Sequence, residues 1–114
     1  MNASTIIAGA SRCYKHPLIS WNREVYLPVS AILDGPGAKG DVKIMVCKTA
    51  GGPAVSYQLG TTCGDGGGFT WFWNSPRQSS RLKVSRWTQK ACEDAFADAI
   101  NNAPEIVRAL VAQL

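Results

Sequence analysis

The sequence predicts an α+β domain in which an antiparallel β-sheet of five to six strands is followed by two C-terminal α-helices packed on one sheet face. Residues 1–87 contain alternating apolar and polar segments joined by short turns, and residues 88–114 show helical spacing instead. The length of 114 residues, with 46% hydrophobic and 18% charged residues, fits one folded domain. Short turns favour antiparallel neighbours, because parallel strands need long crossovers.

The first strands are short. Thr5–Ala8 is an apolar run, and Pro17–Trp21 is either a second short strand or part of a hairpin with the first. Arg23–Leu33 alternates more clearly, with one face made of Val25, Leu27, Val29, Ala31 and Leu33. Pro28 inside this run favours an edge strand or a bulge, since proline cannot donate to a sheet ladder.

The remaining strands follow glycine-rich or proline-containing turns at 34–41, 50–53, 63–68 and 74–80. Asp41–Thr49 alternates Val42, Ile44 and Val46 with Lys43, Met45 and Cys47. The next expected strands are Val55–Leu59, the aromatic Phe69–Trp73, and Arg81–Trp87. For the aromatic rings of Phe69–Trp73 we expect a place in the core or at a subunit interface rather than a base-stacking platform.

The C-terminal segment predicts two helices. Thr88 is a suitable N-cap, Asn101 and Asn102 end the first helix, and Pro104 lies in the first turn of the second. Neither helix is long enough to be stable alone, so both must pack on an apolar surface. That surface is either the sheet of the same chain or a sheet formed by two chains. The expected packing or dimer residues are Phe96, Ile100, Ile106, Val107, Leu110 and Val111.

Charge is unevenly distributed. Residues 1–87 hold ten Lys/Arg against four Asp/Glu, giving +6, whereas residues 88–114 hold two against four, giving −2. A basic strand region is compatible with a polyanionic partner and equally with a merely solvated surface.

Several classes of function are disfavoured by the sequence. It predicts no catalytic residues, cofactor or small-molecule substrate, because Gly64–Gly68 lacks the Lys-Ser/Thr of a phosphate-binding loop and His16 is the only histidine. A zinc site built from Cys13, His16, Cys47 and Cys63 is disfavoured, because there is no second closely spaced pair. The cysteines are expected to be reduced core residues, although Cys63 beside the glycine run is placed to cross-link subunits. No apolar run suggests a signal segment or a membrane span, so a soluble intracellular product is expected.

A family resemblance points to a function. The order of a short N-terminal hairpin, antiparallel strands and two helices broken near a proline resembles coat proteins of single-stranded RNA bacteriophages. The resemblance covers roughly the last 35 residues, RLKVSRWTQKACEDAFADAINNAPEIVRALVAQL, and NNAPEIVRALVAQL in particular is similar to the closing segment of some members.

The resemblance implies a homodimer with a continuous sheet, helices lying over the partner's half, and assembly into a shell around genomic RNA, first in the host cytoplasm and then as the virion. In that family a loop between the last long strands makes contacts around symmetry axes, a part that Gly64–Gly68 or Asn74–Ser80 would take here. The inner sheet face of the family binds an RNA hairpin. From alternation, our candidates for backbone contact on that face are Lys43, Arg81, Lys83 and Ser85, with Tyr57 stacking on a base.

Two other functions remain open at this point. One is a small phage-encoded inhibitor or adaptor that binds a host protein, and the other is a nucleic-acid-binding regulator that does not assemble. A shell protein self-associates through several surfaces, whereas both alternatives stay small. A regulator would also bind nucleic acid with a strong salt dependence.

Overall fold

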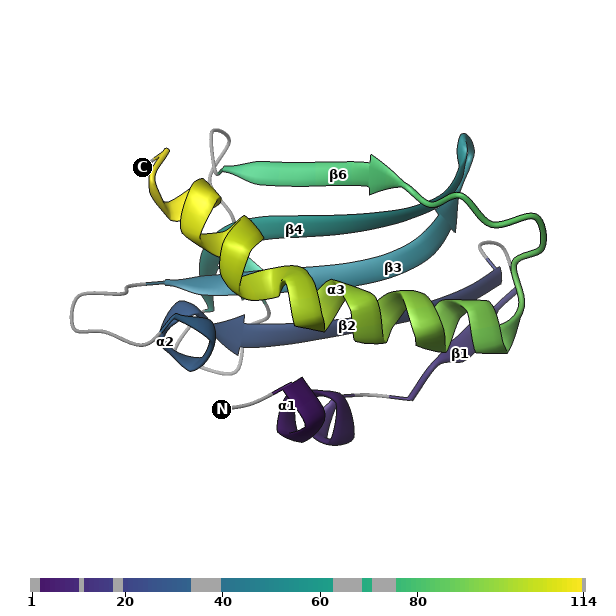
Figure 1. The fold of residues 1–114 in the computed structure, drawn as a ribbon, viewed down its shortest axis with the longest axis horizontal. Coiled ribbons are helices and arrows are strands. Elements are labelled where there is room, and N and C mark those ends of the chain that lie inside the picture. Colours follow the sequence, from purple (N-terminus) through teal and green to yellow (C-terminus); the bar gives the residue numbers. More distant parts are fainter. Residues whose placement is uncertain are drawn as a thin grey trace.

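The computed structural model describes residues 3–10, 12–17, 20–33, 40–62, 69–70 and 76–113. Within them the chain is an α+β structure, as predicted, with an antiparallel sheet and a long helix across one face (Figure 1). None of the described helices is long and apolar enough to cross a membrane. The elements in chain order are α1 (Ala3–Gly9), β1 (Tyr14–His16), β2 (Ser20–Pro28), α2 (Val29–Ile32), β3 (Asp41–Thr49), β4 (Gly52–Thr62), β5 (Phe69–Thr70), β6 (Arg77–Arg81) and α3 (Gln89–Val111).

The sheet has six strands, in the order β1-β2-β3-β4, and two strands pair with different parts of β4. β6 pairs with residues 54–58 of β4, and β5 pairs with residues 61–62. β2, β3 and β4 form the long central ladder, in which Val25 lies opposite Ile44 and Ile44 lies opposite Tyr57. Directly opposed residues of antiparallel strands point to the same face, so this register assigns each side chain to one side of the sheet.

The core lies between the sheet and α3. Val42, Ile44 and Val46 of β3 are fully buried, and Phe96 and Val107 of α3 meet them from above. α3 packs on β2, β3 and β4 of its own chain, so the single-chain packing described above accounts for the buried face.

The α3 helix is continuous, which corrects the prediction of two helices. Thr88 caps it as expected, with its Oγ1 accepting the Ala91 amide at 3.1 Å. Pro104 lies inside the helix and deprives the Ile100 carbonyl of its usual amide donor. The helix bends along its length (Figure 1), as an internal proline favours. It continues past the proline because both halves bury apolar residues, among them Ala99 before it and Val107 and Leu110 after it.

Three further boundaries differ from the sequence prediction. Thr5–Ala8 is helical, because Ala3, Ile6, Ile7 and Ala10 recur at helical spacing and pack against the core. The strand beginning at Arg23 ends at Pro28 rather than Leu33, and Val29–Ile32 forms α2. The last strand is Arg77–Arg81, within a stretch expected to be a loop, and residues 82–88 form an irregular connection to α3.

Two hydrogen bonds hold α3 and its connection in place. Tyr57 donates its hydroxyl to the Ala99 carbonyl at 2.6 Å, a buried bond that ties β4 to the middle of the helix. Trp87 donates its indole Nε1–H to the Trp21 carbonyl at 2.7 Å, which ties the start of the helix to β2. α3 is therefore anchored to the sheet at two separate points.

Replacing Tyr57 by Phe should lower the free energy of unfolding by about 1 kcal/mol, because a buried hydrogen bond is lost while the ring still fills its place. Urea unfolding of the two chains measures the difference. Tyr14→Phe is the matched control, since Tyr14 is 49% exposed, and it should change stability by less than about 0.5 kcal/mol. Equal effects of the two substitutions would contradict the assigned role of the buried hydroxyl.

The same burial predicts a pH dependence. Desolvation raises the pKa of Tyr57 to about 12 from its ordinary value of 10. The phenol of the unfolded chain ionises first, so stability from Tyr57 is complete below pH 10 and is lost as the pH rises through about 12. In an ultraviolet titration of tyrosinate, the most alkaline component should be absent from the Tyr57→Phe chain. Its persistence in that variant would assign the component to another tyrosine.

Candidate nucleic-acid interface

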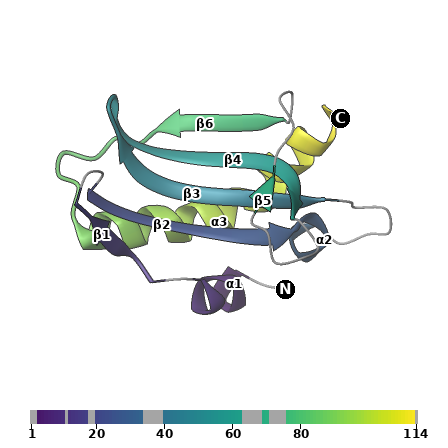
Figure 2. The same cartoon turned by 180° about the vertical axis from the view of Figure 1, so that it is seen from behind.

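The face of the sheet opposite α3 is the candidate functional surface. Figure 2 shows the sheet from this side, with α3 behind the strands. We call this surface the open face. The strand registers give its members, of which Asn22 and Ala54 are buried: Tyr14, Asn22, Glu24, Tyr26, Asp41, Lys43, Met45, Cys47, Ala54, Ser56, Gln58, Arg77, Ser79 and Arg81.

Cross-strand pairing arranges the open face in rows. One row runs Tyr26, Lys43, Gln58 and Arg77 across β2, β3, β4 and β6. Another row ends with Ala54 on β4 and Arg81 on β6. A strand rises about 3.3 Å per residue, so Arg77 and Arg81 lie about 13 Å apart along β6.

The middle of the open face is electrically balanced. Lys43 Nζ lies 3.6 Å from a carboxylate oxygen of Glu24 and 5.7 Å from the ring centroid of Tyr26. Such a half-exposed pair contributes little to stability but lowers the charge available to a ligand. The positive charge of Lys43 is therefore partly neutralised by interactions within the sheet.

The β6 border is different, because its two arginines have no acidic partner among the residues that the structure describes. Arg77 and Arg81 are exposed, and neither forms an ion pair with any carboxylate in the described part of the chain. The Arg81 guanidinium lies over the β3–β4 turn, where a methyl group added at Gly51 would approach its Nη2 to 2.6 Å. We call Arg77, Ser79 and Arg81 the arginine border.

Cys47, the thiol on the open face, is not a reactive group. Burial raises its pKa, an effect that the nearby Lys43 partly opposes and Glu24 reinforces. Because the thiolate is the reactive form, a raised pKa makes Cys47 a weak nucleophile at neutral pH.

The structure places the predicted RNA-binding residues in three different environments. Lys43 and Arg81 share the open face. Lys83 and Ser85 are exposed but follow the end of β6, so they are not part of the sheet. Tyr57 is 2% exposed beneath α3 and is not available to stack on a base, because its strand position points to the covered face. The stacking role predicted for Tyr57 is therefore wrong, whereas RNA contact by Lys83 and Ser85 stays a prediction, although not on the sheet face.

Sequence reasoning missed Arg77 and Tyr14 as members of this surface. For Arg77 the signal was present, since Arg77, Ser79 and Arg81 alternate with Gln78 and Ser80 as in a strand. Tyr14 was missed because β1 is only three residues long, too short to show a period.

The residues expected to pack α3 lie in the core of their own chain. Phe96, Ile100, Val107 and Leu110 are buried, and Ile106 and Val111 pack partly buried against the same cluster. Replacing Leu110 and Val111 by Asp would therefore unfold the single chain, and loss of a dimer would not identify them as contacts between subunits.

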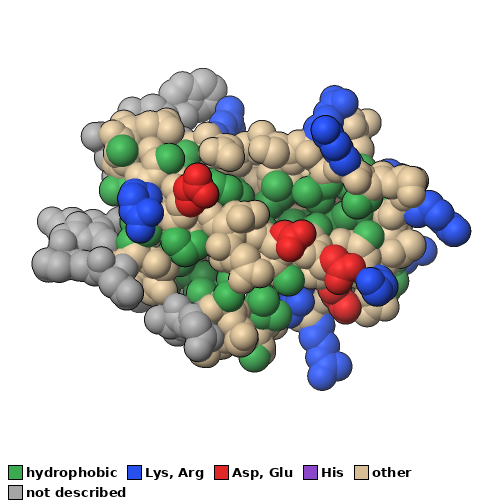
Figure 3. Space-filling view, viewed as in Figure 1, with side chains coloured by type: hydrophobic (Ala, Val, Ile, Leu, Met, Phe, Trp, Pro, Cys, Tyr) green, Lys and Arg blue, Asp and Glu red, His purple; other side chains and the backbone are tan. Residues whose placement is uncertain are grey.

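The helix side of the molecule carries the acidic groups. Glu93, Asp94, Asp98 and Glu105 are exposed on α3, and Figure 3 shows acidic side chains spread along this side. Lys90 pairs with Asp94 at 3.0 Å. α3 itself therefore carries a net negative charge, although the cations Arg12 and Arg23 lie on the same side of the sheet.

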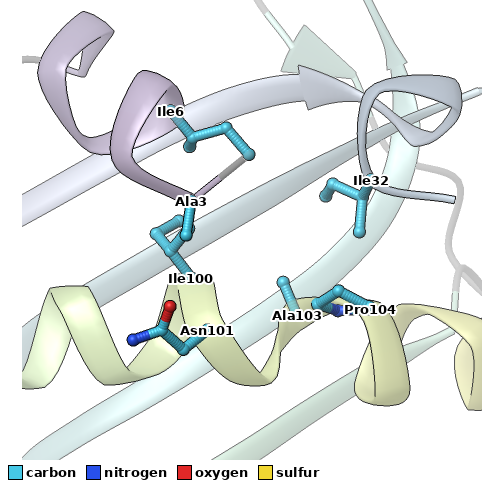
Figure 4. Close-up of a pocket in the computed structure, with 7 residues that line it drawn as sticks. All are labelled: Ala3, Ile6, Ile32, Ile100, Asn101, Ala103 and Pro104. Carbon is cyan, nitrogen blue, oxygen red and sulfur yellow. The ribbon is translucent and has the colours of Figure 1, made fainter. Parts of the chain in front are cut away.

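Two recesses lie on the helix side. One, of about 180 Å³, lies between α1, α2 and α3 and is lined by Ala3, Ile6, Ile32, Ile100, Asn101, Ala103 and Pro104 (Figure 4). Its lining carries no ionisable side chain. The other, of about 270 Å³, is lined by Arg12, Cys13, Arg23, Gln89 and Glu93.

Metal ligands are not grouped in the described residues, where no three His, Cys, Asp or Glu side chains come together. Cys13 is buried beside Cys92 rather than beside Cys47. Cys63, Gly64–Gly68 and Trp71–Trp73 lie outside the described residues, as do residues 74–75 of the segment Asn74–Ser80.

Comparison with known proteins gives no relative from which a function could be transferred to this chain. No family model, no curated protein and no solved structure matches this chain significantly.

Proposed function

We propose that this chain is a capsid protein that self-associates into a shell and binds RNA on its open face, in the manner of the coat proteins of single-stranded RNA bacteriophages. The observation that carries the proposal is the arginine border: two exposed cations, without an acidic partner in the described ranges, on a sheet whose other face is covered by α3. Arginine is the side chain best suited to bind phosphate, through paired N–H donors.

The distribution of charge supports the same function. In a shell around RNA, the surface that faces the nucleic acid must be basic, whereas the outer surface must not attract it. The arginine border supplies exposed cations on the open face, and α3 on the other side of the sheet carries four carboxylates against two cations. Tyr14 and Tyr26, both exposed on the open face, add rings on which unpaired bases can stack.

Self-association has a suitable edge in β6. Leu59 donates its amide to the Pro76 carbonyl, and Leu82 donates to the Pro53 carbonyl. Because hydrogen-bonded pairs alternate along an antiparallel ladder, the backbone groups of Gln78 and Ser80 face β4. Those of Arg77, Ser79 and Arg81 then face outward.

An outward-facing row of backbone donors and acceptors is a template for another strand. We assign this edge to β6 of a second copy. Antiparallel pairing of two such edges would join two sheets into one and bring two arginine borders together on one surface. This is the continuous sheet that the family resemblance implies.

The enzyme alternative has no observation in its favour. Of the other two alternatives, a non-assembling nucleic-acid-binding regulator would use the same arginine border, and an inhibitor or adaptor would not need it. The oligomeric state and the nucleic-acid content together separate the three.

The chain purified from bacteria is expected to form particles of megadalton mass containing nuclease-resistant RNA. Size exclusion with light scattering gives the mass, and the ratio of absorbance at 260 and 280 nm on the same peak gives the nucleic-acid content. A small species free of nucleic acid would refute the proposal in favour of an inhibitor or adaptor. A small species that binds RNA would favour the regulator.

Ser79→Pro is the variant that tests the β6 edge. Proline removes the outward amide of Ser79 without removing a hydrogen bond to β4, so the chain should stay folded and small. Gln78→Pro is the matched control, since it removes an amide that faces β4 and should lower stability. Particles formed by a folded Ser79→Pro chain would exclude this edge as a subunit contact.

Arg77→Ala combined with Arg81→Ala should weaken RNA binding and reduce its salt dependence. Each lost phosphate contact with single-stranded nucleic acid lowers the slope of log K against log salt by about 0.7, so two contacts lower it by about 1.4. Fluorescence anisotropy of a labelled RNA oligonucleotide measures this in chains that also carry Ser79→Pro.

Lys90→Ala combined with Arg108→Ala is the control for net charge, because it removes two cations from α3. That pair should leave the slope unchanged. An equal fall in slope for both pairs would mean that overall charge, rather than the arginine border, determines binding.

A further inference from the structure

Two cysteines from distant parts of the chain meet in the core. Cys13 lies just before β1, and Cys92 lies near the start of α3. They are 7% and 0% exposed, belong to the same buried cluster, and are both free thiols. Cys13 lines a recess together with Gln89 and Glu93, which flank Cys92 on α3, and it lies close enough to Cys92 to help raise the pKa of that thiol. Two neighbouring thiols form a disulfide when their sulfur atoms approach to about 2 Å.

The sulfur atoms of Cys13 and Cys92 lie in different environments. Cys13 lines the recess that also contains Arg12, Arg23, Gln89 and Glu93, so a small reagent can approach it from solvent. Cys92 is not among the lining residues and is fully buried. Burial, together with the neighbouring Cys13, raises the pKa of the Cys92 thiol well above its ordinary value. Reaction with an external reagent therefore begins at Cys13.

The recess also fits a particular class of reagent. Its lining includes two arginines, Arg12 and Arg23, against one acidic residue, Glu93. Arg23 is held in place by stacking on the Phe96 ring, 4.5 Å from its centroid, and by donating to the Ile7 carbonyl at 3.0 Å. An anionic low-molecular-weight disulfide such as oxidised glutathione finds complementary charge beside the Cys13 thiol.

We propose that Cys13 and Cys92 form an intrachain disulfide when the protein meets a small-molecule disulfide. The Cys13 thiolate attacks one sulfur of oxidised glutathione and releases one glutathione thiol, leaving a mixed disulfide on Cys13. Cys92 then attacks the Cys13 sulfur, loses its proton, and releases the second glutathione. The two protein thiols are oxidised to one disulfide, and one oxidised glutathione is reduced to two thiols.

The bond would tie the segment before β1 to the first turns of α3 and enclose every strand of the described sheet in one covalent loop. A cross-link over so long a loop restricts the unfolded chain and thereby stabilises the folded one. The effect concerns the single chain, so it does not depend on RNA binding or on assembly.

The test uses the full chain carrying Cys47→Ser and Cys63→Ser, incubated with excess oxidised glutathione at pH 8.5 and then quenched with acid. The expected product has lost two hydrogen atoms and carries no glutathione. Its tryptic digest should contain residues 13–15 joined to residues 91–108. The midpoint of thermal unfolding should rise by several degrees and return after reduction.

Cys92→Ala in the same background is the matched control, and it should stop at the glutathione adduct on Cys13. A stable adduct on the chain with both cysteines, or thiols that resist oxidation until the chain is denatured, would overturn the proposal. The same digest of the wild-type chain identifies the partner of Cys13 without relying on any substitution. A partner other than Cys92 there would overturn it equally.

Discussion

The division of each central strand between a covered and an open face is the constraint on which the rest of the molecule depends. β3 expresses it most simply, since Val42, Ile44 and Val46 are fully buried while Lys43, Met45 and Cys47 alternate with them. Burying an aliphatic side chain of this size contributes about 1.5–3 kcal/mol, so shifting the register by one residue would cost far more than any surface contact returns. α3 must therefore lie on one side only, and any function of the sheet itself must use the other.

That constraint also places the charges. The polar side of an amphipathic helix lying on a sheet points away from it, so Glu93, Asp98 and Glu105 can only face outward. Lys43, Arg77 and Arg81 alternate with residues that face the helix, so they appear on the open face, whereas Lys48 of β3 and Arg23 of β2 take the opposite face. The placement of each of these charges follows from the period of its own element.

The residue periods of strands and helices also explain how much of the fold could be predicted from the sequence. β3 was predicted with its boundaries and faces because its alternation is long and unbroken, and the Thr88 cap is a local signal that does not depend on the rest of the fold. α1 was taken for a strand because the short run Thr5–Ala8 fits either period. The face of Tyr57 could have been read from alternation, since Val55, Tyr57 and Leu59 share one face of β4. Its hydrogen-bond partner, the Ala99 carbonyl, comes from far along the chain and could not. The arginine border likewise depends on a pairing between β4 and β6 that no local pattern specifies.

Pro104 shows why a strong local signal can fail for a physical reason. A proline inside a helix costs about 3 kcal/mol, which justified ending one helix and starting another near it. The cost is outweighed here because Val107 and Leu110, both beyond the proline, are 0% and 1% exposed, and together they contribute about 3–6 kcal/mol on burial. If the helix ended at Asn101 and Asn102, the part of the sheet beneath Val107 and Leu110 would be uncovered unless the chain returned to it by another route. Continuity with a bend keeps both halves of α3 on one face of the sheet.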